Sequence, residues 1–212
     1  MTHHIPVDVH ARSRRRKAVL AGGVVLGLGA TMTLAAWTDD VWVSGAFSAG
    51  NFNVQGNTGV GGWQDYDSAP GGGLVFSTAP TALTPNDEVY APLNLRVDPA
   101  ANSYDARITL STAPTGPAVS TTANNALFAN LTVTLFTVAP TNCSSAGTSG
   151  VTPLMNEQPL PTTLTASPIL TLPKNSTEQG VCFKFKLKSD APPSVRGGTT
   201  GVLSWRFHAE SV

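Results

Sequence analysis

The chain is predicted to fold as an all-β protein, an antiparallel β-sandwich, behind a helical signal peptide. Short runs of alternating apolar and polar residues recur after residue 40, and this is the pattern of strands with one buried face. Segments rich in Pro, Thr and Gly separate these runs. No later run has a convincing helical period, so about eight or nine short strands are expected in one domain spanning 36–212.

The first part of the chain has the features of an export signal. Residues 1–35 contain a basic region at 12–17, an apolar region at 18–35, and small residues before a cleavage site. An uncleaved membrane anchor is the alternative, because the apolar region is about long enough to span a bilayer. Cleavage after Ala35 is the first choice and cleavage after Ala36, just before Trp37, is the second.

Cleavage would change the charge of the protein. Five of the 13 basic residues and one of the 13 acidic residues precede the cut, which leaves 8 basic and 12 acidic residues and a net charge of −4. That balance argues against nucleic acid or anionic lipid as a partner. Contact with a membrane is expected only through the signal peptide, and the exported protein is expected outside the cell or at its surface.

The first strand is expected at 41–54. Phe52 and Val54 alternate with polar residues, and Val41 and Val43 alternate in the same way. Glycines within this stretch allow bends or bulges. An apolar strand would therefore lie close to the new N-terminus that cleavage creates.

Three short motifs in this part of the chain occur in a fixed order. The junction AAWTD (35–39) is followed by AFSAGNFNV (46–54) and then by the turn LTPND (83–87). This order resembles the TasA/camelysin family, secreted β-proteins of Gram-positive bacteria that a SipW-type signal peptidase processes. The resemblance covers about the first hundred residues. It implies the jelly-roll form of the sandwich and that peptidase as a partner during export.

The resemblance also implies a structural role, because TasA-like proteins assemble by exchange of an N-terminal strand. The sequence agrees with a self-assembling fibre or a subunit of a biofilm or cell-surface matrix, in which a strand at a chain end completes a neighbour's sheet. The partner would be a second copy of the chain. The alternative is that this strand fills the protein's own sandwich. The expected donor side chains are Ala46, Phe47, Phe52 and Val54.

A glycine-rich loop at 56–73 offers a different function. Its aromatic side chains could stack on a sugar, which would make the protein a monomeric carbohydrate- or surface-binding module. Its two aspartates lack the spacing of a known calcium loop, and packing over the end of the sandwich is the simpler alternative. The residues concerned are Trp63, Asp65, Tyr66 and Asp67.

The remaining strands are placed by the same alternation. The runs at 89–97 and 104–111 are expected to form an antiparallel hairpin, with Pro92 at an edge or bulge because it has no N–H to donate. Segments 111–125 and 139–160 are expected to be loops. Further strands are expected at 74–76, 131–137, 169–172, 181–188 and 202–209.

Cys143 and Cys182 are the only cysteines, and in an exported chain they are expected to form one disulfide. A metal or redox pair is the alternative. Cys182 alternates with core residues, so it should face away from the core and hold the Cys143 loop over the outer face of its sheet.

No catalytic, metal or cofactor site is predicted. His208 is the one histidine that remains after cleavage, so a zinc peptidase would lack its second histidine. The chain has no Gly-x-Ser-x-Gly motif, and a serine triad would need His208 as its base. The chain is therefore predicted not to be an enzyme, with a secreted hydrolase as a weaker alternative.

Overall fold

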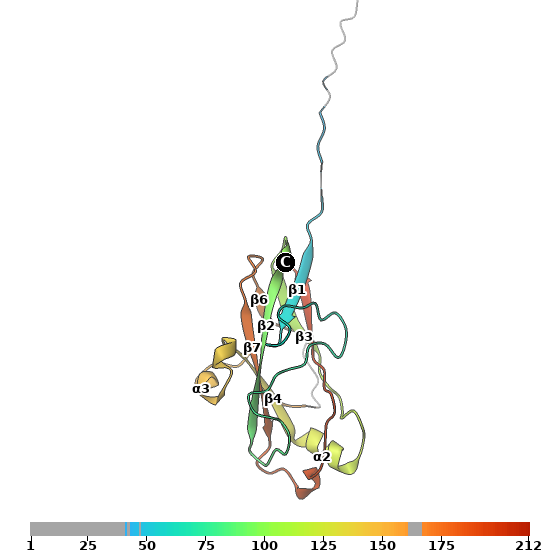
Figure 1. Ribbon diagram of the computed structural model, residues 1–212, viewed down its shortest axis with the longest axis vertical. Coiled ribbons are helices and arrows are strands. Elements are labelled where there is room, and N and C mark those ends of the chain that lie inside the picture. The colour runs from blue at the N-terminus through green and yellow to red at the C-terminus, as the bar shows by residue number, and fades with distance from the viewer. Residues whose placement is uncertain (1–40, 42, 47, 161–166) are drawn as a thin grey trace, which may run out of the picture. The chain divides into compact units, whose positions relative to one another are not determined.

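The computed structural model describes residues 41, 43–46, 48–160 and 167–212. Two antiparallel sheets form a sandwich, which confirms the predicted fold class (Figure 1). The strand order is β1-β2-β7-β4-β5 in the five-stranded sheet and β6-β3-β8 in the three-stranded sheet. The strands are β1 (Phe52–Asn57), β2 (Glu88–Asn102), β3 (Ala106–Thr112), β4 (Leu131–Thr137), β5 (Met155–Pro159), β6 (Pro168–Leu172), β7 (Gln179–Leu187) and β8 (Arg206–Ser211).

The core is built from the residues that alternate along the strands. Phe183 of β7 is 1% exposed, and its ring lies 5.6 Å from that of Trp205 and 5.9 Å from that of Phe207, so that β7 and β8 meet across the sandwich. Burial of one such phenylalanine contributes about 1.5–3 kcal/mol. On β2 the buried inward set is Val89, Ala91, Leu93, Leu95 and Val97.

At Pro92, β2 pairs with β7 on one side and has no described strand beside it on the other. Pro92 therefore lies at a local edge, as predicted. The carbonyl of Tyr90 accepts a hydrogen bond from the N–H of Ser77, at 3.0 Å, and so points away from β7. The nitrogen of Pro92, two residues further on, points the same way. Pairing with β1 stops at Asn94, opposite Asn57. The missing N–H therefore removes no bond from the sheet.

The predicted hairpin between 89–97 and 104–111 is wrong. β2 pairs with β1 and β7, whereas β3 pairs with β6 and β8 in the other sheet. The chain crosses between the sheets at residues 103–105. Alternation determines which face of a strand is buried but not which strand lies beside it, so a hairpin and a crossover fit the sequence equally well.

Two segments expected to be loops contain regular structure. Segment 139–160 contains β5, the 3₁₀ turn η1 (Pro140–Asn142) and helix α3 (Ser145–Thr148). Outside both segments, a further 3₁₀ turn, η2 (Pro193–Val195), precedes β8. Segment 111–125 contains the start of a second helix. Helix α2 (Thr122–Asn130) is capped by Thr121, whose side chain accepts a hydrogen bond from the N–H of Asn124. Its sequence TANNALFAN buries one apolar side chain, Phe128, which explains why no helical period was detected.

The strand expected at 74–76 is not formed. Leu74 and Phe76 are half-buried and pack against the core as part of a loop. No helix among the described residues is both long and apolar enough to cross a membrane.

Candidate functional site

The segment before β1 belongs to neither sheet. The predicted strand 41–54 is therefore wrong in its N-terminal part, since the strand begins at Phe52. Pairing with β2 ends there, and the last backbone contact is the hydrogen bond from the N–H of Ser103 to the carbonyl of Asn51. Without a neighbouring strand, the described residues of 41–51 do not adopt strand structure. Val41 is 84% exposed and Val43 is 91% exposed.

The predicted donor residues differ in where the structure places them. Phe52 and Val54 lie in β1, half-buried against the protein's own core, so in this conformation they complete their own sandwich. Ala46 is exposed. Phe47 and the predicted cleavage residues Ala35, Ala36 and Trp37 lie outside the described residues.

Four strands of the described part end a sheet, and three of these edges carry features that hinder further pairing. At β1, Gly56 and Gln64 exchange two backbone hydrogen bonds, of 3.0 and 2.9 Å. β5 ends at Pro159 and β6 begins at Pro168, and both strands have a register shift against their neighbour. β8 has no proline, and its one register shift against β3 lies at its start, between Arg206 and Phe207, so that the register is unbroken from Phe207 to Ser211. Prolines, bulges and covering segments are the usual protection of edges, so β8 is the edge open to pairing.

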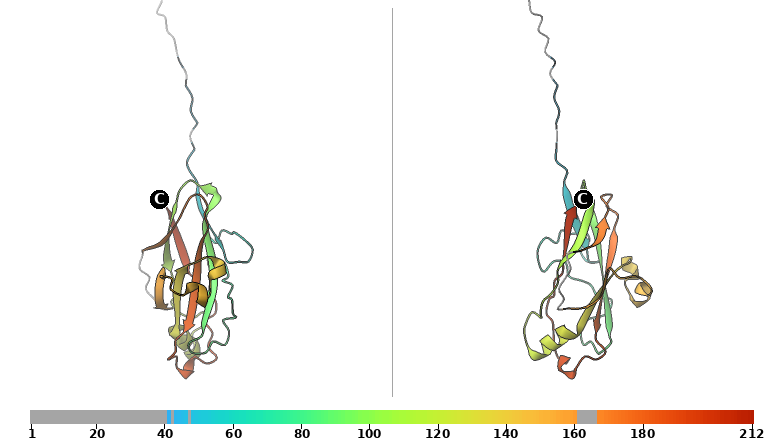
Figure 2. Two further views of the ribbon diagram at one scale, coloured as in Figure 1. Left: turned by 90° about the vertical axis from the view of Figure 1, so that its left-hand side faces the viewer. Right: turned by 180° about the vertical axis from the view of Figure 1, so that it is seen from behind.

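The core is incompletely covered beside this open edge. Phe207 and Ala209 of β8 point toward the core but are only half-buried, as are Phe52 and Val54 of β1. The inward residues of β7, by contrast, are buried. β1 and β8 lie along the same side of the sandwich (Figures 1 and 2). One side of the sandwich therefore has both an unpaired strand and exposed core side chains.

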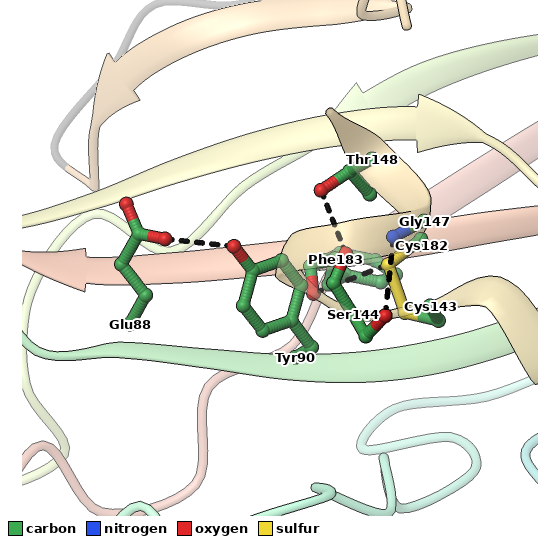
Figure 3. The surroundings of a disulfide bond; sticks show 8 residues. All are labelled: Glu88, Tyr90, Cys143, Ser144, Gly147, Thr148, Cys182 and Phe183. Carbon is green, nitrogen blue, oxygen red and sulfur yellow. Dashed lines mark hydrogen bonds between the residues drawn. A yellow bond between two sulfur atoms is a disulfide. The ribbon is translucent and has the colours of Figure 1, made fainter. Parts of the chain in front are cut away.

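The predicted disulfide between Cys143 and Cys182 is present, with 5.3 Å between their Cα atoms. It holds the segment of η1 and α3 over the outer face of the five-stranded sheet (Figure 3). Together with Tyr90 and Phe136, the two cysteines form a second buried apolar cluster. Phe136, which the alternation places on an outer face, is buried for this reason.

A charged network lies beside this cluster. The hydroxyl of Tyr90 donates to Glu88 at 2.7 Å (Figure 3), and the amino groups of Lys184 and Lys186 lie 3.6 and 3.8 Å from the same carboxylate. Burial opposes ionisation of Glu88, but the Tyr90 hydrogen bond and the two lysines outweigh it and lower its pKa. Burial, with the nearby carboxylate, raises the pKa of Tyr90 to about 12.

This network predicts a pH dependence of stability. Because the pKa of Glu88 is lower in the folded protein than the ordinary 4.5, its stabilisation is fully present above pH 4.5 and is lost as the pH falls through the folded pKa. Glu88→Gln should therefore flatten the acid side of the stability profile, measured by urea unfolding between pH 7 and pH 3. The exposed change Glu178→Gln is the charge-matched control, and an equal flattening there would contradict the assignment.

The aromatic residues of the 56–73 loop make contacts within the protein. The guanidinium of Arg96 lies 4.2 Å from the centre of the Trp63 ring and donates to the side chain of Gln55. Tyr66 lies so close to Gly72 that a Cβ there would come within 2.6 Å of its ring. One face of Trp63 is thus covered by a cation, and Tyr66 packs against the loop.

The two aspartates of the same loop differ in their contacts. Asp65 accepts a hydrogen bond from Asn53 of β1, and the same amide donates to Asp98 of β2. Asp67 is exposed. Asp65 therefore ties the loop to the five-stranded sheet. No group of three His, Cys, Asp or Glu side chains placed to hold a metal ion occurs among the described residues.

His208 lies on the outer face of the three-stranded sheet. It is 3.8 Å from Glu210 and lines a hollow of about 400 Å³ together with Arg107 and Ser111. The hydroxyl of Ser111 donates to the backbone carbonyl of Arg206. That bond directs the serine proton to the backbone and so gives no support to a serine–histidine pair.

Comparison with known proteins does not identify a relative: no protein-family model matches the chain, and no curated protein matches it significantly. The interpretation of the site therefore depends on the geometry itself. Sequence reasoning missed the open edge of β8. No local signal could have shown it, because β1, β3, β4 and β7 lack proline as β8 does, and only the strand order makes β8 an edge.

Proposed function

We propose that this protein is a secreted structural protein that assembles into an extracellular fibre or a cell-surface or biofilm matrix. The observation that carries the proposal is the apolar segment at 41–51, whose described residues lie outside both sheets while β1–β8 share one hydrophobic core. A strand of one subunit that joins the sheet of the next gains backbone hydrogen bonds and buries its alternate side chains. When such a contact is head-to-tail and does not close, it produces a filament.

The proposal includes export and a fold relationship. Residues 1–35 would be removed by a SipW-type signal peptidase, which would free the N-terminal segment only after export. The resemblance to the TasA/camelysin family supports this order of events. A jelly-roll divides eight strands between two sheets and places its first strand beside its last. The strand orders β2-β7-β4-β5 and β8-β3-β6 support that fold, with β1 moved to the sheet of β2.

The disulfide supports an extracellular role, because such bonds persist in oxidising compartments. It holds the segment that contains η1 and α3 on the outer face of the five-stranded sheet, which is the face turned away from the core. A subunit with this clamp keeps its fold while its N-terminal segment is engaged elsewhere.

Val43→Asp tests the proposal against a matched change at the next residue. Successive side chains of a strand point to opposite faces, so on pairing Val43 would face the acceptor's core and Ser44 would face solvent. We expect Val43→Asp to abolish assembly of protein that begins at Trp37 and Ser44→Asp to preserve it, because a buried unpaired carboxylate is costly. The measurement is size-exclusion chromatography with light scattering.

The opposite pattern, or equal assembly of the two variants, would contradict strand donation by this face. Sugar binding that depends on Trp63, in an unmodified protein that begins at Trp37 and does not assemble, would favour the carbohydrate-binding alternative.

A further inference from the structure

We propose that the free edge of β8 is the acceptor that binds residues 41–51 of a second copy of this chain. The inference depends on the proposed strand donation and adds the place where the donated strand binds.

The backbone of β8 presents a row of unpaired groups. The N–H of Val212 donates to the carbonyl of Asp105, on the β3 side, at 3.0 Å. Because the direction alternates along a strand, His208 and Glu210 also point toward β3. The N–H and carbonyl groups of Phe207, Ala209 and Ser211 therefore point to the opposite side, where β8 has no neighbouring strand in the described part of the chain.

The sheet that contains β8 is the smaller of the two. It has three strands against five, and the core side chains at its β8 edge are half-buried. A strand added beside β8 would make a fourth strand and would cover Phe207 and Ala209. It would also lie on the side of the sandwich along which β1 runs (Figures 1 and 2), and Phe52 and Val54 of β1 are half-buried. The other three edges are bridged, bulged or end in proline.

The segment at 41–51 has the chemistry that this edge requires. It contains no charged residue, and Val41 and Val43 alternate with other residues. The unbroken edge from Phe207 to Ser211 needs about 17 Å of extended chain, which about five residues supply. The segment is therefore long enough to pair with the whole edge and still leave residues to connect the two subunits.

A second copy fits this edge better than the protein's own segment. Three hydrogen bonds hold Asn51 to Ser103: the N–H of Ser103 donates to the carbonyl of Asn51, the N–H of Asn51 donates to the hydroxyl of Ser103, and that hydroxyl donates to the side-chain oxygen of Asn51. β1 starts immediately afterwards, at Phe52. To lie along its own β8, the chain would have to reverse direction within a few residues before Phe52. A segment from another subunit requires no such reversal.

Proline substitutions at two free edges test the assignment. Ala209→Pro removes an N–H that points to the free side of β8 and leaves the bonds to β3 in place. Thr171→Pro is the matched control. The carbonyl of Asp105 points to β8, so by alternation Arg107 also points to β8, whereas Ala106 and Ile108 point to β6, opposite Leu172 and Leu170. Thr171 is therefore directed to the free side of β6. Both variants are made in protein that begins at Trp37 and are imaged by negative-stain electron microscopy, with folding checked by circular dichroism.

Loss of filaments in Ala209→Pro with filaments retained in Thr171→Pro is the expected result. Filaments from a folded Ala209→Pro variant would overturn the β8 assignment and leave strand donation standing, with another edge as the acceptor. Absence of filaments from the unmodified protein would overturn both proposals.

If Ala209→Pro does not fold, hydrogen exchange of the unmodified protein tests whether the free edge of β8 is the acceptor. Amides that gain a hydrogen-bond partner exchange more slowly. Assembly should slow exchange in the peptide that spans 206–212 and leave the peptides that span β5 and β6 unchanged. Filaments in which exchange at 206–212 is unchanged would overturn the assignment.

Discussion

Replacing both cysteines by alanine is expected to lower the free energy of unfolding by about 4 kcal/mol. The disulfide joins residues 39 apart in sequence, and the chain-entropy model gives about this stabilisation for a loop of that length. The loss should be measured by denaturant unfolding of the double variant Cys143→Ala and Cys182→Ala. The disulfide also holds η1 and α3 over Tyr90 and Phe136, so the variant should expose part of this cluster.

Reduced wild-type protein is the control for the double variant. It lacks the covalent link but keeps the sulfur atoms, so a similar loss in both would assign the effect to the link. A loss below about 1 kcal/mol in both would show that the Cys143 segment stays in place without the disulfide, and it would contradict this explanation of stability.

Phe183→Ala is expected to lower the free energy of unfolding by about 3–5 kcal/mol. Phe183 is 1% exposed, and its ring contacts Phe185 within its own strand as well as Trp205 and Phe207 from the other layer. Truncation would leave a cavity between the sheets that these rings cannot fill. Chemical denaturation measures the loss.

Phe76→Ala is the matched control for this core substitution. Phe76 also contacts Phe185, with 5.8 Å between ring centres, but it is half-buried in a loop. Its loss should be clearly smaller, because less apolar area returns to water and the loop can adjust. Equal losses would contradict the assignment of Phe183 to the centre of the core.

Alternation along the chain was sufficient to predict the main strands. The run 131–137 coincides with β4, and the outward position of Cys182 placed the disulfide, which the cysteine count predicted, over the outer face. Alternation could not choose the neighbours of β2 and β3, because each strand satisfies its pattern in either sheet. It also missed α2 and β5, whose sequences bury few apolar side chains.

The candidate site was predictable only in part. The sequence drew attention to an apolar stretch near the expected cleavage site, but its pattern continued from Val41 to Val54 without showing where the sheet begins. That boundary at Phe52 depends on β2, which supplies pairing only as far as Asn102. The open edge of β8 depends on the whole strand order, and strand order is not encoded in any one segment.

The most direct test of the account is negative-stain electron microscopy of two forms of the protein. One form begins at Trp37, and the other begins at Phe52, which removes the proposed donor segment and keeps β1. Filaments are expected from the first form and dispersed particles from the second. A folded Trp37 form that stays dispersed across a range of salt concentrations would contradict strand donation.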